Sequence, residues 1–476
     1  MSDFKSLFKH SRNYLFSNIA TKALGFVSIP IYTRILSVED FGVINVFLAT
    51  VGIASVLLTL NSEVAISRYY YDAKNEDDFK NFVGTSVFLV SFIFVINSFL
   101  GLLLLSFISN SLSFERLLTI SLIPVALYSI INSIFQQIYG VLLKSKKIAI
   151  VSSIQVYLAF ILSVIAILCL PDKKYYGQVL GTIFSMLILG CYLVLQLKQY
   201  FSKCFKKVHV KYILSYSLPY IPYTLSGVIL TQFGRLIMSR YDGFSAAGLY
   251  SFSANIGMLM LILISVSHQA WNPYYFQYMT NRNYENINKD YDLIWRITLV
   301  SATFLSLFGS EIGMILGKRD FFAYLYIIPY FVLGYVFYQW AYVYMRNTGF
   351  VKKTIWNAVA ILIAGIINIL LSIILIDHFK ELGVAIAFVA SYFFLFAISW
   401  CINKWILCAY VPCITLFFRP FFFFFGLWIC AVLLSLTNWN YWIVILKFSI
   451  FLFGSCFLLK RYLYLIVNYF KNKNIS

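Results

Sequence analysis

The chain is built from apolar runs of about twenty residues, joined by short polar segments. A run of this length crosses the hydrocarbon core of a bilayer as a helix, at about 1.5 Å per residue. Only a helix satisfies every backbone N–H and C=O within one segment, so lipid excludes an open strand. We therefore expect an all-α polytopic membrane protein of about 14 transmembrane helices. The predicted spans are residues 13–36, 41–61, 83–107, 118–143, 148–170, 177–197, 213–237, 246–270, 294–316, 323–345, 354–376, 383–403, 414–436 and 441–464.

The composition leaves little room for a soluble domain. Hydrophobic residues make up 61% of the 476 residues, and charged residues only 12%. The loops between predicted spans rarely exceed about twenty residues, which is too short for a catalytic domain. The eight cysteines and four histidines lack metal-ligand spacing, and no glycine-rich phosphate loop occurs. We expect no cofactor, no metal and no enzymatic activity.

Basic residues set the predicted orientation. Lys5, Lys9 and Arg12 precede the first span without a small-residue cleavage site, so we expect a retained helix and a cytoplasmic N-terminus. In that orientation about 24 Lys and Arg lie in cytoplasmic segments and about 8 outside, as in a bacterial inner-membrane protein. Both termini are then cytoplasmic. The net charge of +19 follows from this topology, not from nucleic-acid binding.

The same orientation assigns the loops to the two sides of the membrane. Residues 198–212 and 275–293 are predicted to be cytoplasmic, whereas residues 172–176 and 377–382 are predicted to face outward.

An internal repeat organises the chain. Residues 34–42 and 240–248 share the same spacing from arginine to glycine at an offset of 206 residues, and this offset also relates Gly177 to Gly383. A register kept over six spans predicts two duplicated halves. Because each half has an even number of helices, the halves are parallel repeats about an axis along the membrane normal. A substrate site is then expected in a central cavity between them.

The repeat divides the chain into four parts. We predict an N-terminal six-helix bundle at 1–197, a cytoplasmic basic linker at 198–212, a C-terminal six-helix bundle at 213–405, and two additional helices with a basic tail at 406–476.

Motifs in both halves resemble those of the polysaccharide flippases of the multidrug/oligosaccharidyl-lipid/polysaccharide exporter superfamily. They are Pro30-Ile-Tyr-Thr-Arg34, Asp40-Phe-Gly42, Leu218-Pro219-Tyr-Ile-Pro222, Gly248-Leu-Tyr-Ser251 and Glu311-Ile-Gly-Met-Ile-Leu-Gly317. The resemblance covers nearly the whole chain. It departs from the family late in the seventh helix, where members often carry an acidic residue before the arginine and this chain has Gly234-Arg235.

The resemblance implies an O-antigen repeat-unit flippase. Such a protein moves an undecaprenyl-diphosphate-linked oligosaccharide from the cytoplasmic to the outer leaflet for lipopolysaccharide, capsule or related surface polysaccharide. It implies alternating access between the halves, membrane lipid as the surroundings, and a polysaccharide polymerase and glycosyltransferases as further partners. No nucleic acid is expected.

Two polar stripes on repeat-related helices are the main candidate substrate site. Lys22 lies near the middle of the first span on a stripe with Asn18, and Arg235 lies on the seventh with Thr224 and Thr231. A lipid-facing charge would cost roughly 2.5–3.5 kcal/mol, so such residues are functional by default. Arginine and lysine suit a diphosphate. A structural alternative stays open, in which Lys22 snorkels or pairs with an acid and Arg235 sits at the outer interface.

Four further residues are candidates with weaker patterns. Arg68 is a candidate for the cytoplasmic mouth, and Tyr338 belongs to a tyrosine stripe that could contact sugars or simply pack. Glu63 and Glu311 are candidates for ion coupling, although each could be a paired structural acid.

The sequence leaves three other functions as alternatives. A cation-coupled multidrug exporter of the same superfamily would need acids where its substrate binds, whereas the central charges here are basic. A lipid II flippase would share the diphosphate. A membrane enzyme of polysaccharide assembly would need a large outer loop or an intramembrane histidine with a partner, and neither is expected from the sequence.

Overall fold

The computed structural model describes residues 24–473 except 113, 203–204, 411, 413–414 and 438–439. The chain forms two compact units, residues 1–248 and 249–476. No strand occurs in the described ranges, which confirms the all-α prediction. Eleven of the described helical stretches are long and apolar enough to cross a membrane, and a shorter apolar helix covers Leu24–Ile35.

Two of the eleven stretches are long enough to cross twice. Tyr220–Gln269 has 50 residues and Ile355–Ile406 has 52, about 75 Å each when helical, against a hydrocarbon core of about 30 Å. The first stretch breaks at Asp242 and Gly243, where Gly243 has φ +78°. The second breaks at Lys380, with φ 47°. Both breaks lie between predicted spans, and the count of about fourteen stays a prediction.

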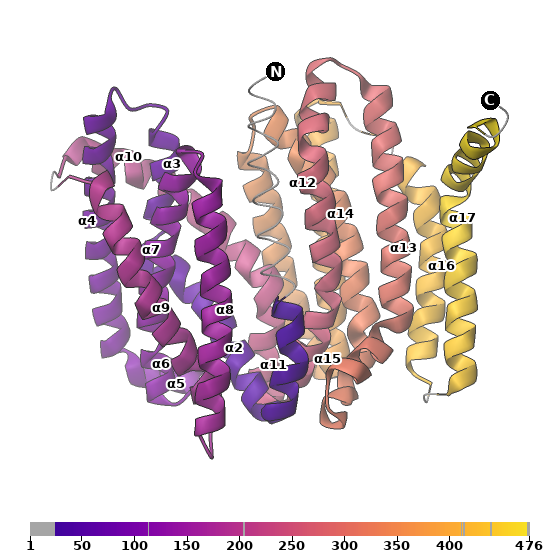
Figure 1. The fold of residues 1–476 in the computed structure, drawn as a ribbon, viewed down its shortest axis with the longest axis horizontal. Coiled ribbons are helices and arrows are strands. Elements are labelled where there is room, and N and C mark those ends of the chain that lie inside the picture. The colour runs from indigo at the N-terminus through magenta and orange to yellow at the C-terminus, as the bar shows by residue number, and fades with distance from the viewer. Residues whose placement is uncertain are drawn as a thin grey trace. The chain divides into compact units, whose positions relative to one another are not determined.

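The first unit contains the helices from α2 to most of α11. Their bounds are α2 Val38–Thr59, η1 Ser62–Val64, α3 Ala65–Tyr69, α4 Glu76–Leu103, α5 Leu105–Leu112, α6 Arg116–Ile120, α7 Leu122–Val141, α8 Ser145–Cys169, α9 Tyr175–Leu197, η2 Lys198–Tyr200, α10 Lys207–Ser217 and α11 Tyr220–Gly257. In this unit α7, α8 and α9 run side by side, and α10 lies across one end of the unit (Figure 1).

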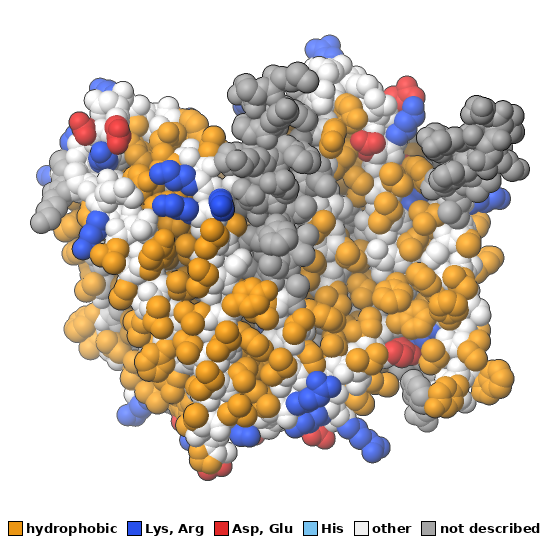
Figure 2. Space-filling model, in the orientation of Figure 1, with side chains coloured by type: hydrophobic (Ala, Val, Ile, Leu, Met, Phe, Trp, Pro, Cys, Tyr) orange, Lys and Arg blue, Asp and Glu red, His pale blue; other side chains and the backbone are white. Residues whose placement is uncertain are grey.

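Apolar side chains of the first unit occupy both its core and its outer surface. Phe82, Phe135 and Leu193 from α4, α7 and α9 are almost fully buried in one cluster. Phe92 and Phe99 of α4 instead point outward and are more than half exposed. Figure 2 shows such apolar side chains over the middle of these helices, with Lys and Arg near their ends. An apolar outer surface with charges near the helix ends is expected when the helices are surrounded by lipid.

Segments predicted to lie on opposite sides of the membrane occupy opposite ends of the first unit (Figure 1). At one end, the ammonium group of Lys144 donates to the hydroxyl of Tyr200, a residue of the segment 198–212, at 2.7 Å. At the other end, the backbone N–H of Tyr175, a residue of the segment 172–176, donates to the Asp40 carboxylate at 3.4 Å. The first unit therefore has the alternation of sides that the span assignment requires.

Two glycines of the predicted repeat touch one another reciprocally. A methyl group added at Gly42 of α2 would lie 1.8 Å from the backbone oxygen of Phe244, and one added at Gly248 of α11 would lie 2.2 Å from that of Val38. Positions 42 and 248, and also 38 and 244, differ by the same 206 residues. A contact in which each partner meets the equivalent of the other has the two-fold symmetry expected of duplicated helices.

The second unit contains eight further elements. Their bounds are α12 Leu259–Thr280, α13 Tyr284–Leu316, η3 Arg319–Ile327, α14 Ile328–Phe350, α15 Ile355–Cys401, the π-helix η4 Ile402–Ile406, α16 Thr415–Ser435 and α17 Tyr441–Lys473. Its core includes Trp295 of α13 stacked on Trp340 of α14 at 4.7 Å. The Trp295 indole donates to the backbone oxygen of Phe417 in α16 at 3.2 Å.

Several helices extend past the apolar windows that predicted them. The predicted loop 275–293 is mostly helical, because α12 continues to Thr280 and α13 begins at Tyr284. The Asn283 side chain caps α13 by accepting from the backbone of Asn286 at 3.2 Å. Similarly, α14 continues five residues beyond the predicted end at 345. Capping and polar pairs sustain helical turns where hydropathy no longer reports them.

Candidate functional site

Arg235 is a buried cation in the membrane-spanning part of α11. Its side chain is only 6% exposed, and its Nη1 donates to Gln232 Oε1 at 2.6 Å. The hydroxyls of Thr224 and Thr231 donate to backbone oxygens one helical turn earlier, those of Tyr220 and Gly227, both at 3.2 Å. Each threonine hydroxyl thus uses its hydrogen in a bond to its own helix, and its oxygen can still accept a hydrogen bond.

The other stripe, with Lys22 and Asn18, lies outside the described residues. Its position relative to Arg235 therefore stays a prediction.

Glu63 and Arg68 lie near the same end of the first unit but in different surroundings. Glu63 is buried in η1 and accepts a hydrogen bond from Ser133. The Arg68 side chain is 55% exposed and pairs with Asp72 at 3.5 Å. An exposed pair of this kind adds little stability, so Arg68 is free to exchange partners.

Glu311 is paired inside the second unit. Its Oε1 lies 2.7 Å from Nζ of Lys447 on α17, and the Lys447 side chain is 4% exposed. The pair joins α13 to α17 in the apolar part of both helices. Glu311 is thus an acid with a buried partner, one of the two alternatives left open by the sequence.

Tyr338 belongs to an aromatic group in the second unit. Its ring meets Tyr392 edge-on at 5.6 Å and lies 6.1 Å from Tyr342. Tyr338 is partly exposed, whereas Tyr335 is buried against Phe388. The predicted tyrosine stripe is therefore divided between packing and a partly accessible ring.

A buried arginine that was not singled out from the sequence lies next to this group. Arg346 of α14 is 7% exposed, and its Nη2 is hydrogen-bonded to Nδ1 of the buried His268 on α12. Its guanidinium carbon lies 4.9 Å from the ring of Trp271, 5.4 Å from Tyr275 and 5.1 Å from Tyr342. We call these five residues the Arg346 cage.

The Arg346 cage corrects two expectations. Arg346 falls one residue beyond the predicted span 323–345, and only the longer α14 places it in the bundle. An intramembrane histidine with a partner was not expected, and His268 has one. That partner is a cation, which cannot orient a histidine as a general base in the way that a carboxylate does. The pair therefore does not favour acyl transfer.

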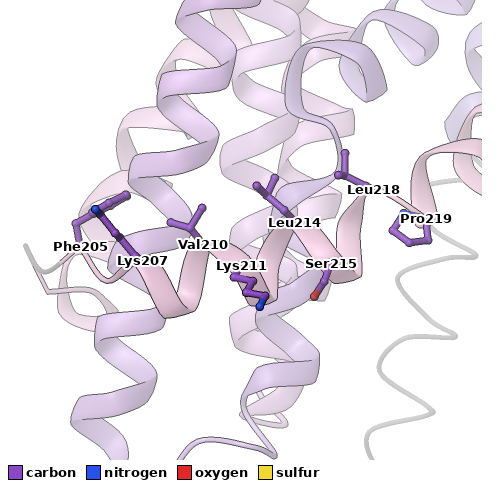
Figure 3. A pocket seen from close by; sticks show the side chains of 8 residues that line it. All are labelled: Phe205, Lys207, Val210, Lys211, Leu214, Ser215, Leu218 and Pro219. Carbon is purple, nitrogen blue, oxygen red and sulfur yellow. The ribbon is translucent and has the colours of Figure 1, made fainter.

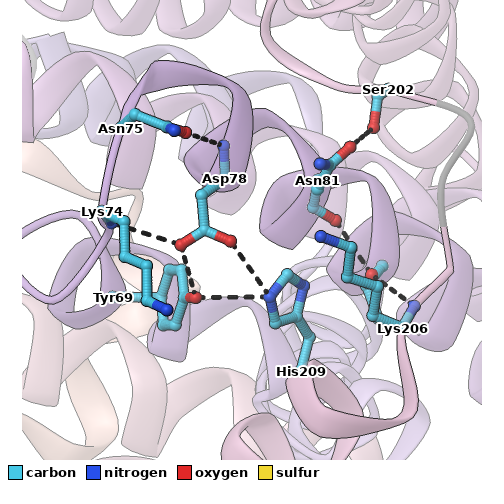
Figure 4. A network of polar contacts seen from close by, with 9 residues as sticks. Tyr69, Lys74, Asn75, Asp78, Asn81, Ser202, Lys206 and His209 are labelled. Carbon is cyan, nitrogen blue, oxygen red and sulfur yellow. Dashed lines mark hydrogen bonds and ion pairs between the residues drawn. The ribbon is translucent and has the colours of Figure 1, made fainter.

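A polar network fixes α10 to the end of the first unit (Figure 4). The Tyr69 hydroxyl donates to Asp78 at 2.9 Å, and His209 Nε2 lies 3.3 Å from that hydroxyl and 3.6 Å from Asp78. Burial lowers the pKa of His209, with Asp78 acting in the opposite direction, and burial raises the pKa of Tyr69 to about 12. The network joins α10 to α3 and α4 through His209, Tyr69 and Asp78.

The outer face of α10 is an open groove of about 710 Å³. Figure 3 shows Lys207 and Lys211 on the same helix as Val210 and Leu214, with Leu218 directly after its end. Cations followed by apolar residues suit the boundary between anionic headgroups and hydrocarbon. Elsewhere, no group of three or more His, Cys, Asp or Glu in the described part of the chain could hold a metal ion.

Comparisons with known proteins assign the chain to a family. Residues 9–279 match the family described as Polysaccharide biosynthesis protein. Lsg locus protein 1 of Haemophilus influenzae is 25% identical over 283 residues, which are 57% of this chain. The match spans 66% of that relative, slightly less than two thirds of its length.

Solved structures share the fold at low sequence identity. The lipid II flippase MurJ, in an inward closed conformation, has a TM-score of 0.68 at 15% identity and covers 96% of this chain and 98% of its own. An inward-facing multidrug transporter of the MATE family gives 0.61 at 14%, covering 85% and 94%. A MOP superfamily transporter from Pyrococcus furiosus, noted for the reverse polarity of its binding pocket, gives 0.59 at 15%, covering 85% and 96%. The MOP superfamily fold expected from the sequence is thus confirmed.

Proposed function

Since the chain belongs to the polysaccharide biosynthesis protein family, we propose that it flips undecaprenyl-diphosphate-linked oligosaccharide repeat units from the cytoplasmic to the outer leaflet of the bacterial inner membrane. The product would serve O-antigen, capsule or a related surface polysaccharide. A polymerase and glycosyltransferases would be its partners in that pathway.

The observation that carries this proposal is the buried cation of α11. Arg235 is 6% exposed inside an apolar helical stretch. A charged side chain is energetically costly there and is functional by default. A guanidinium can bind a phosphate through two hydrogen bonds. A cationic drug would be repelled there, so the charge favours an anionic substrate over the multidrug alternative.

The predicted site residues take distinct roles in this proposal. Lys22 and Arg235 receive the diphosphate, while the free lone pairs of Thr224 and Thr231 accept hydrogen bonds from sugar hydroxyls, with Asn18 alongside. Arg68 attracts the anion at the cytoplasmic mouth, where its exposed side chain can leave Asp72. The partly accessible Tyr338 contacts a sugar face.

Alternating access between the bundles 1–197 and 213–405 is the proposed mechanism. The close approach of Gly42 and Gly248 supports a tight closure where the paired helices meet. If transport is coupled to an ion, the buried Glu63 is the better candidate, because Glu311 would first have to leave Lys447.

A lipid II flippase is the second candidate. The likeness to MurJ favours it, because both substrates carry an undecaprenyl diphosphate and would need the same cations.

Deleting the gene and analysing lipid-linked intermediates tests the proposal. We expect diphosphate-linked repeat units to accumulate on the cytoplasmic leaflet and surface polysaccharide to fall, with lipid II unchanged and with recovery on re-expression. Accumulation of lipid II would support the second candidate instead. Unchanged levels of both intermediates would contradict flipping of either substrate.

A further inference from the structure

Arg346 differs in its partners from two other cations of its unit, the buried Lys447 and the partly exposed Arg296. Lys447 is paired with Glu311 at 2.7 Å, and Arg296 is bound to both carboxylate oxygens of Asp292 at 3.0 Å. Arg346 has no acid within 4.0 Å among the residues that the structure describes. Its one hydrogen-bond partner there is the ring nitrogen of His268.

Most donors of the Arg346 guanidinium are unused. Nε and Nη1 are buried and have no hydrogen-bond partner in the described part of the chain. Three aromatic rings compensate part of the lost hydration, since a desolvated cation is attracted to the face of a ring. An unsatisfied buried charge nevertheless remains costly, because burial removes water that no acceptor replaces.

The chemistry around Arg346 indicates what kind of group would complete it. A guanidinium presents a planar fork of donors that fits the oxygens of a phosphate. Because Nδ1 of His268 accepts from Arg346, the neutral ring carries its proton on Nε2, a buried donor with no hydrogen-bond partner in the described part of the chain. Trp271, Tyr275 and Tyr342 offer flat apolar faces beside this charge. A phosphate attached directly to a sugar ring meets both requirements at once.

We propose that Arg346 and His268 bind the phosphate at the sugar end of the lipid-linked substrate, with the rings of the Arg346 cage against the first sugar. This inference rests on the proposed function and adds a binding site on α12 and α14 to it. Because Arg346 is 7% exposed, the substrate enters after these two helices part. The guanidinium then exchanges aromatic rings for oxyanion contacts.

The decisive variant is Arg346→Met, which removes the charge but keeps a long, unbranched apolar side chain. Replacing an unsatisfied buried charge by an apolar group of similar size is often neutral or stabilising. We expect the purified variant to melt at the same or a higher temperature than the wild type and to bind undecaprenyl diphosphate at least about tenfold more weakly. Arg346→Lys should retain intermediate affinity. Arg296→Gln removes a paired arginine of the same unit and should leave affinity unchanged.

Binding is measured by thermal shift and by tryptophan fluorescence in nanodiscs, with phosphatidylglycerol as a second ligand and excess inorganic pyrophosphate as competitor. Pyrophosphate should compete in the wild type, and phosphatidylglycerol affinity should be unchanged in Arg346→Met. Equal binding of undecaprenyl diphosphate by Arg346→Met and wild type would overturn the site, as would no competition by pyrophosphate. An equal loss for phosphatidylglycerol would assign the site to membrane lipid.

The outcomes separate this inference from the proposed function. If wild type binds undecaprenyl diphosphate, and deletion causes repeat units to accumulate, but Arg346→Met binds normally, only the Arg346 site is wrong. A wild-type protein that does not bind the diphosphate lipid contradicts both.

Discussion

Replacing Gly42 with alanine perturbs the closest helix contact of the first unit. The added methyl group would lie 1.8 Å from the backbone oxygen of Phe244, whereas ordinary contact begins at 3.4 Å. The two helices would therefore have to separate by about 1.6 Å at this point. The atoms nearest to the added methyl group all belong to the backbone of Phe244 and Gly248, which cannot move aside as a flexible side chain could.

We expect Gly42→Ala to lower the free energy of unfolding by about 1–3 kcal/mol, the usual cost of forcing an extra methylene into a packed site. Gly227→Ala is the matched control on α11, because nothing lies within 4 Å of its added methyl group. It should stabilise the helix by about 0.5–1 kcal/mol. Because Gly42 and Gly248 share one contact, the double replacement should cost less than the sum of the single ones.

Thermal unfolding of the purified variants in detergent, followed by size-exclusion chromatography, measures these differences. Gly42→Ala and Gly248→Ala should both lower the melting temperature, and Gly227→Ala should not. Equal melting temperatures for Gly42→Ala and Gly227→Ala would refute the glycine contact and remove this support for a two-fold repeat.

Three further results are expected. At equal membrane levels, Lys22→Ala and Arg235→Ala should each reduce surface polysaccharide, and Lys22→Arg should keep part of it, because the diphosphate needs positive charge; wild-type export by the double alanine variant would exclude both as necessary ligands. Lys447→Ala should destabilise the second unit by about 3 kcal/mol, the lower end of the range for a broken buried pair, since it leaves the partly buried Glu311 without its cation, and adding Glu311→Gln should recover much of the melting temperature; no recovery would mean that packing, not charge, was lost. Burial lowers the pKa of His209 in the folded state, so the unfolded chain binds more protons, and stability should fall as the pH drops below about 6.5; His209→Gln should flatten the melting temperature between pH 7.5 and 5.5, and an unchanged slope would contradict this assignment.

The membrane class and the all-α fold could be predicted because both depend on local patterns. An apolar window of about twenty residues reports a span wherever it occurs. The 206-residue offset can be read from the sequence alone. Two glycines that it relates, Gly42 and Gly248, lie in contact, while the duplication of whole halves stays a prediction. Helix ends were less accurate, because capping by residues such as Asn283 extends helices into polar sequence.

The sequence by itself determined that this chain is helical, lies in a membrane and carries cations inside its spans, since hydropathy and charge are properties of short segments. Only the tertiary structure decided which of those charges are compensated. Glu311 and Lys447 are 136 residues apart, and Arg346 and His268 are 78 apart, on helices that no local pattern pairs. The energy of a buried charge depends on the atoms within a few ångströms of it, and folding alone brings those atoms together.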